Sequence, residues 1–93
     1  MRPRKRVNEI QTPREDRRKS YYEKVRTQDL TIQQAVLEYR YMLGMSQKEF
    51  SLFTRLPLKT IRDFEQGKAN PTLKTLMKLL KGSGLEVSVR LKP

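Results

Sequence analysis

The chain of 93 residues contains no cysteine and no histidine. It therefore cannot form disulfides, the usual zinc-binding sets, or catalytic arrangements that need a histidine base or a cysteine nucleophile. Long apolar runs are also missing, and no apolar segment follows the charged N-terminus, which argues against a membrane span and a secretory signal. We expect a cytoplasmic protein with no enzymatic activity, no cofactor and no membrane partner.

Acidic side chains are scarce relative to basic ones. The sequence has 21 Lys and Arg against 10 Asp and Glu, which gives a net charge of +11. A surplus of this size favours a polyanionic partner such as nucleic acid. The charge density peaks in residues 1–27, a predicted basic N-terminal arm with ten basic and four acidic side chains. Hydrophobic residues make up only 35% of the chain, so its core must be small.

The basic arm contains two distinct features. RPRKR at residues 2–6 is either a basic segment for the minor groove of DNA or a solvated tail. Further on, Thr12, Pro13 and Glu15 have the spacing of a capping box, which predicts a helix over residues 13–26. The apolar stripe of this helix is short and consists of Tyr21, Tyr22 and Val25. Such a weakly amphipathic helix needs a partner surface to be stable.

The following segment has the periodicity of a helix with one packed face. Its apolar residues lie at i, i+3, i+4, i+7 and i+11, and they are Ile32, Ala35, Val36, Tyr39 and Leu43. Gly44 ends this helix. Ser46 and Glu49 then form a capping box that begins a second, shorter helix. The inward residues of the second helix are Phe50, Phe53 and Leu56.

Two more helices are expected. Pro57 suits the start of a third helix, in which Ile61 and Phe64 face inward and after which Gly67 marks the end. The apolar residues of the fourth helix are Leu73, Leu76, Met77, Leu79 and Leu80. Two short helices joined by a tight turn, with a longer helix on each side, allow the second short helix, residues 57–66, to enter the major groove of DNA.

The C-terminal residues 85–93 have the period of a half-buried strand. The residues on its apolar face are Leu85, Val87, Val89 and Leu91. No second strand is expected in this chain, so another copy or another protein must complete the sheet. The predicted fold is thus an all-α domain of four to five helices over residues 28–84, followed by a β-strand for dimerisation. A disordered C-terminus is the alternative.

Residues 32–84 resemble the phage-repressor-like (XRE) helix-turn-helix family. The resemblance rests on MSQKEF at residues 45–50 and LPLKTIRDFEQGKANPTLKTLMKLLKGSGLEV at residues 56–87. The terminal LEVSVRLK is similar to HipB-type antitoxins, whose strand pairs between subunits, and LPLKTIRDFEQG also resembles HigA-type antitoxins. The resemblance implies a lambda-repressor-like fold and a homodimer that binds a palindromic operator in double-stranded DNA.

The resemblance also implies roles for particular residues. Gln47 opens the second helix and is expected to contact DNA near the backbone, and its neighbour Lys48 is expected to reach a phosphate. Arg40 and Glu65 are implied to form a structural ion pair. The remaining candidates for DNA contact lie on the exposed side of the third helix or just after it, and they are Leu58, Lys59, Thr60, Arg62, Asp63 and Lys68. Among these, Arg62 is best suited to guanine, and Lys68 is expected to contact a phosphate.

Three positions depart from the family pattern. Arg55 lies in the turn where the family prefers glycine, and Thr54 occupies a position that is usually apolar. Leu58 replaces a polar residue at the first reading position, where it either contacts a thymine methyl group or packs against the protein. Leu52 and Phe53 are more apolar than a solvent face requires, so they either extend the core or form a dimer or partner surface.

Several functions remain open on the sequence alone. The leading hypothesis is a dimeric transcriptional repressor that is also the antitoxin of an operon it autoregulates. The partner toxin would be a HipA-like kinase or a HigB-like, ribosome-dependent RNase. The alternatives are an interaction protein that mainly neutralises the toxin, a phage-type repressor without a toxin, and non-specific binding of RNA or single strands by the basic arm.

Overall fold

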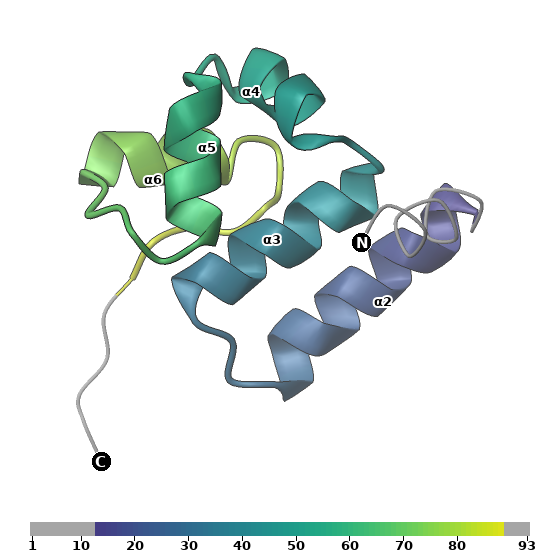
Figure 1. The fold of residues 1–93 in the computed structure, drawn as a ribbon. Coiled ribbons are helices and arrows are strands. Elements are labelled where there is room, and N and C mark those ends of the chain that lie inside the picture. The colour runs from purple at the N-terminus through teal and green to yellow at the C-terminus, as the bar shows by residue number, and fades with distance from the viewer. Residues whose placement is uncertain (1–12, 89–93) are drawn as a thin grey trace.

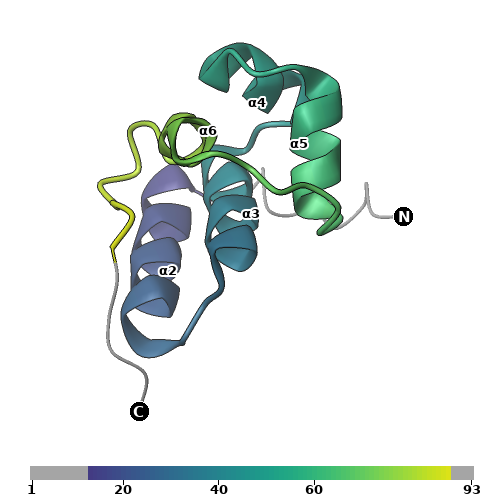
Figure 2. The same cartoon turned by 90° about the vertical axis from the view of Figure 1, so that its left-hand side faces the viewer.

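The computed structural model describes residues 13–88, which form an all-α fold. The helices are α2 (Arg14–Thr27), α3 (Ile32–Leu43), α4 (Gln47–Thr54), α5 (Leu58–Glu65) and α6 (Leu73–Leu79). Helices α2 and α3 run antiparallel and side by side, while α4, α5 and α6 form a second group (Figure 1). In the view turned by 90°, α3 lies between α2 and α5 (Figure 2). The predicted all-α architecture is therefore confirmed for the described residues.

The start of α2 differs from the prediction. Pro13 occupies the N-cap position and makes no side-chain capping bond, whereas the prediction placed Thr12 at the N-cap and Pro13 one residue inside the helix. Proline has no side-chain oxygen to accept a bond from the first turn, although its fixed φ suits the entry to a helix. Thr12 and the basic segment at residues 2–6 lie outside the described residues.

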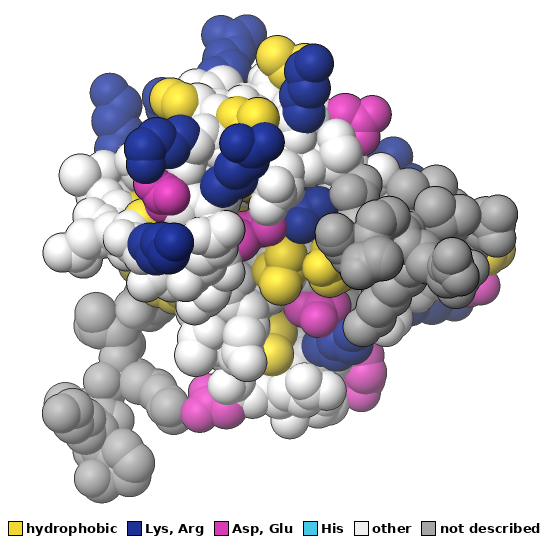
Figure 3. Space-filling model, viewed as in Figure 1, with side chains coloured by type: hydrophobic (Ala, Val, Ile, Leu, Met, Phe, Trp, Pro, Cys, Tyr) yellow, Lys and Arg dark blue, Asp and Glu magenta, His cyan; other side chains and the backbone are white. Residues whose placement is uncertain are grey.

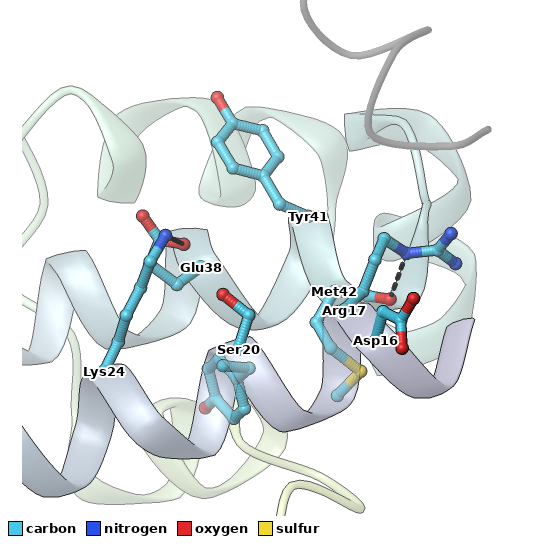
Figure 4. Close-up of a pocket in the computed structure, with 8 residues that line it drawn as sticks. Asp16, Arg17, Ser20, Lys24, Glu38, Tyr41 and Met42 are labelled. Atoms are coloured by element: carbon cyan, nitrogen blue, oxygen red, sulfur yellow. Dashed lines mark hydrogen bonds and ion pairs between the residues drawn. The ribbon is translucent and has the colours of Figure 1, made fainter. Parts of the chain in front are cut away.

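Helix α2 is fastened to α3 along its length. Arg17 Nε donates to the main-chain oxygen of Met42 over 3.0 Å, and Lys24 Nζ lies 3.0 Å from Glu38 Oε1 (Figure 4). Tyr21, between these two contacts, is only 2% exposed. The groove between the two helices has a volume of about 180 Å³ and is lined by these paired groups. The partner surface that α2 needs is therefore α3.

The predicted boundaries of α3 and α4 follow from local capping. Gly44 has φ 71° and ends α3, as expected from the sequence. The Ser46–Glu49 capping box begins α4, with Glu49 Oε1 2.7 Å from the Ser46 nitrogen. A second capping box, formed by Thr31 and Gln34 at the start of α3, was not predicted, although its T-x-x-Q spacing is visible in the sequence.

The hydrophobic core is small and rich in rings. Its largest fully buried side chains are Tyr21, Val36, Tyr39, Phe50, Ile61 and Leu79. Two of the apolar residues that predicted the fourth helix do not face the core, since Leu73 is 59% exposed and Met77 is 63% exposed. The buried stripe of α6 is set by Leu76, Leu79 and Leu80, and at 100° per residue Leu73 and Met77 fall on its flank.

The chain after α6 is held by two tyrosines from the other helix pair. The Tyr22 hydroxyl donates to the main-chain oxygen of Ser83, and the Tyr39 hydroxyl donates to that of Lys81. Residues 85–88 follow without forming a strand, so the predicted C-terminal strand is not seen in the described residues. Val89 and Leu91, two of its four predicted apolar residues, lie outside them. A single strand cannot form a sheet, because its main-chain groups need a second strand to pair with.

Over residues 13–88, no helix combines the length and the apolar character that crossing a membrane requires.

Replacing Tyr21 by phenylalanine is expected to raise the free energy of unfolding by about 1 kcal/mol at neutral pH. Among the described residues the buried Tyr21 hydroxyl has no hydrogen-bond partner, and phenylalanine keeps the ring contacts without that group. Burial also raises the pKa of Tyr21 above its ordinary value of about 10. The free energy of unfolding of the wild type should therefore be highest below about pH 10 and fall as the pH rises further, because Tyr21 ionises at a lower pH in the unfolded chain than in the folded one. The gain from Tyr21→Phe should grow in that range.

Urea denaturation near neutral pH and above pH 10 measures both effects. The matched control is Tyr22→Phe, which loses the hydrogen bond to Ser83 and should be less stable than wild type. A lower stability of Tyr21→Phe at neutral pH would mean that its hydroxyl has a partner and would contradict this account.

Candidate nucleic-acid interface

Helices α4 and α5 are joined by a tight turn whose backbone explains two of the departures from the family pattern. Thr54 is buried at an apolar position, where its hydroxyl donates to the main-chain oxygen of Phe50 over 2.8 Å. Arg55 ends α4 in the left-handed conformation, with φ 62° and ψ 35°. Leu56 is buried and Pro57 provides the N-cap of α5. The turn therefore keeps the geometry that a glycine would give, with an exposed arginine in its place.

Replacing Arg55 by glycine is expected to raise the free energy of unfolding by about 0.5–1 kcal/mol. The left-handed conformation is strained by about 1–2 kcal/mol in a residue with a Cβ atom, and the greater unfolded-state entropy of glycine offsets part of the gain. Thermal and urea denaturation of Arg55→Gly and Arg55→Ala provide the measurement. Alanine retains the strain, so a rise of equal size in both variants would contradict the explanation.

A buried ion pair fixes the angle between the helices. Arg40 Nε lies 2.6 Å from Glu65 Oε2, and the two side chains are 4% and 8% exposed. Arg40 also donates to the main-chain oxygen of Met45 over 2.9 Å. Glu65 Oε1 accepts a further bond from Gln47 Nε2 over 2.8 Å, and Gln33 donates to the Glu65 main-chain oxygen. This network ties α3 and the start of α4 to the end of α5.

The outer face of α5 carries two basic side chains and one acidic one, and further basic side chains lie beside it. Ile61 and Phe64 are buried beneath it, as the sequence predicts. Lys and Arg side chains gather over α4, α5 and α6 on this side of the molecule (Figure 3). The predicted DNA-contact residues that are exposed are Lys48, Lys59, Arg62 and Lys68, and those that are partly exposed are Gln47, Leu58, Thr60 and Asp63. They belong to the start of α4, the outer side of α5 and the loop after α5.

Two features of this face were not predicted. Gln47 is fixed through its amide by Glu65, which orients a side chain expected near the DNA backbone. Lys59 and Asp63, considered separately in the sequence, form an ion pair over 2.7 Å. Their i, i+4 spacing was the available signal for this pair.

The family assignment agrees with this geometry. A helix-turn-helix family model matches residues 36–88, which is more than half of the chain. The comparisons with curated proteins and with solved structures gave no match. The matched residues include most of α3 and all of α4, α5 and α6, whereas α2 precedes them. The chain belongs to the XRE-type helix-turn-helix family of DNA-binding regulatory domains.

Proposed function

We propose that this protein is a transcriptional repressor that recognises a specific DNA sequence with α5. The observation that carries the proposal is a helix-turn-helix arrangement in which the outer side of α5 and the segments beside it present four exposed basic side chains, those of Lys48, Lys59, Arg62 and Lys68. Ile61 and Phe64 fasten the helix to the core, so its other side is free to enter a major groove. The Arg40–Glu65 ion pair and the Gln47 contact hold α4 at a fixed angle to it. A rigid pair of helices is what base readout requires.

We further propose that it binds as a homodimer through residues 85–91. Support comes from the alternating apolar pattern of this segment and from the need of a single strand for a partner. Leu85 packs against the core while Val87 is 37% exposed, which leaves apolar surface for a second copy. Two α5 helices one DNA turn apart would then read a palindromic operator.

The resemblance to HipB- and HigA-type antitoxins extends the proposal to an antitoxin that represses its own operon. Its partner would be a HipA-like kinase or a HigB-like RNase. Exposed apolar side chains on α4 and α6 provide surface for such a partner, and they are Leu52, Leu73 and Met77. Copurification with the product of the neighbouring gene tests this extension, and a monodisperse complex with a defined stoichiometry is the expected result.

Two substitutions separate base readout from phosphate contact. Arg62→Ala is expected to weaken operator binding by about 1–3 kcal/mol and to relax the preference at one base position, because Arg62 is exposed on α5. Lys48→Ala should weaken binding to all sequences alike and reduce the slope of the logarithm of affinity against the logarithm of salt concentration by about one. Binding isotherms on operator and random duplexes at several salt concentrations measure both effects.

Arg26→Ala, at the end of α2, is the matched control and should leave both affinities unchanged. Equal losses on operator and random DNA for Arg62→Ala would contradict the reading role of that residue.

A further inference from the structure

The ion pair on the outer face of α5 is placed where DNA would lie. Lys59 Nζ and Asp63 Oδ2 are 2.7 Å apart, and the two side chains are 85% and 32% exposed. The residues are one helical turn apart, on the side away from the buried Ile61 and Phe64. They therefore present a cation and an anion together to any ligand of α5.

Helix stability does not explain this pair. Exposed pairs of this kind contribute little to folding. The order is also the less favourable one, since the cation precedes the anion along the helix. Lys59 is in the first turn of α5 and Asp63 is near its end, so both charges oppose the helix dipole. A carboxylate on the proposed DNA face is moreover repelled by phosphates. The pair is better explained by what it recognises.

The G·C base pair offers the complementary edge in the major groove. Guanine O6 and cytosine N4 are joined by a Watson–Crick hydrogen bond, so they are about 2.9 Å apart, close to the separation of the Lys59 and Asp63 atoms. Guanine presents two acceptors, O6 and N7, to a lysine, and cytosine N4 presents a donor to a carboxylate. An A·T pair with adenine in place of guanine fits poorly, because the adenine N6 donor faces the ammonium and the thymine O4 acceptor faces the carboxylate. A T·A pair keeps an acceptor at O4 and a donor at N6, but the thymine methyl group lies beside O4 where guanine has its second acceptor, N7.

We propose that Lys59 and Asp63 together read one G·C base pair, with Lys59 donating to guanine and Asp63 accepting from cytosine N4. The inference rests on the proposed DNA-binding function. In the free protein each side chain satisfies the other, and on DNA each gains a base as a second partner. Asp63 also weakens binding to other sequences, because its negative charge is unfavourable wherever no hydrogen-bond donor of a base faces it.

Selection of binding sites from a pool of random duplexes tests this inference with the full-length protein. Sites selected by the wild type should share one invariant G·C pair. Changing that pair to A·T, with adenine in place of guanine, should weaken wild-type binding by about 5- to 150-fold. Asp63→Asn should prefer adenine where the wild type prefers cytosine, because asparagine forms two hydrogen bonds with adenine N6 and N7. Glu23→Gln, which removes an exposed carboxylate from α2, is the matched control and should keep the wild-type preference.

The outcomes distinguish this inference from the proposed function. A reversed preference in Asp63→Asn supports the pair as the reader of G·C. An unchanged preference in that variant overturns the inference and leaves the proposed function intact. If the wild type selects no common sequence, the proposed function fails and the inference fails with it.

Discussion

Replacing Glu65 by alanine is expected to lower the free energy of unfolding by about 3–5 kcal/mol. The substitution leaves the Arg40 guanidinium, which is 4% exposed, without its carboxylate in the protein interior. Gln47 loses its partner as well, so the start of α4 is no longer fastened to the end of α5. Urea denaturation measures the loss of stability. The affinity for operator DNA, measured under conditions where the variant is folded, should also fall.

A double replacement isolates the buried charge as the cause. Substituting Arg40→Met and Glu65→Leu together removes both charges, and buried ion pairs replaced in this way often give proteins of equal or higher stability. We expect the double variant to recover most of the stability lost by Glu65→Ala. A double variant as unstable as Glu65→Ala would show that the unpaired charge of Arg40 is not the cause of the lost stability.

Removing residues 1–27 is expected to lower the free energy of unfolding by more than about 3–5 kcal/mol, which is the typical cost of truncating a single buried aromatic side chain. The deletion removes α2, including Tyr21, whose ring centroid is 5.7 Å from that of Tyr39 on α3. It also removes the Tyr22 hydrogen bond to Ser83 beyond α6. Because a domain of this size has little stability to spare, the truncated chain should lose cooperative unfolding.

The matched control is removal of residues 1–12 alone, which keeps α2. This shorter deletion should retain the cooperative unfolding that the longer one loses, and circular dichroism during urea denaturation compares both chains with wild type. Equal midpoints for all three would contradict the structural role of α2. Since α2 precedes the residues that match the family model, the result also decides whether the domain is larger than that match.

Local signals predicted most of the fold. Gly44 and the Ser46–Glu49 capping box define the end of α3 and the start of α4 through bonds within a few residues. Predictions that depended on packing were less successful. The apolar residues Leu73 and Met77 looked like core positions in the sequence, yet the neighbours that would cover them are absent in the described residues. The predicted C-terminal strand is not seen in residues 85–88, and the alternating apolar pattern that suggested it does not by itself supply a strand to pair with.

The candidate site shows the same division. The family resemblance implied the Arg40–Glu65 pair, which joins residues far apart in the sequence. The bond from Gln47 to Glu65 had no sequence signal, because it forms only when α4 crosses the end of α5. The positive φ of Arg55 had a signal of another kind, since glycine is the residue that this turn favours.

Binding of the wild-type protein to the DNA upstream of its own gene, compared with a scrambled duplex of equal composition, tests the central claim most directly. The measurement belongs at physiological salt, with the protein-to-DNA stoichiometry determined in parallel. The account predicts a preference of about a thousandfold or more, with two protomers on each site. Equal affinity for both duplexes, falling steeply with salt, would contradict it and reduce the basic face to a non-specific electrostatic surface.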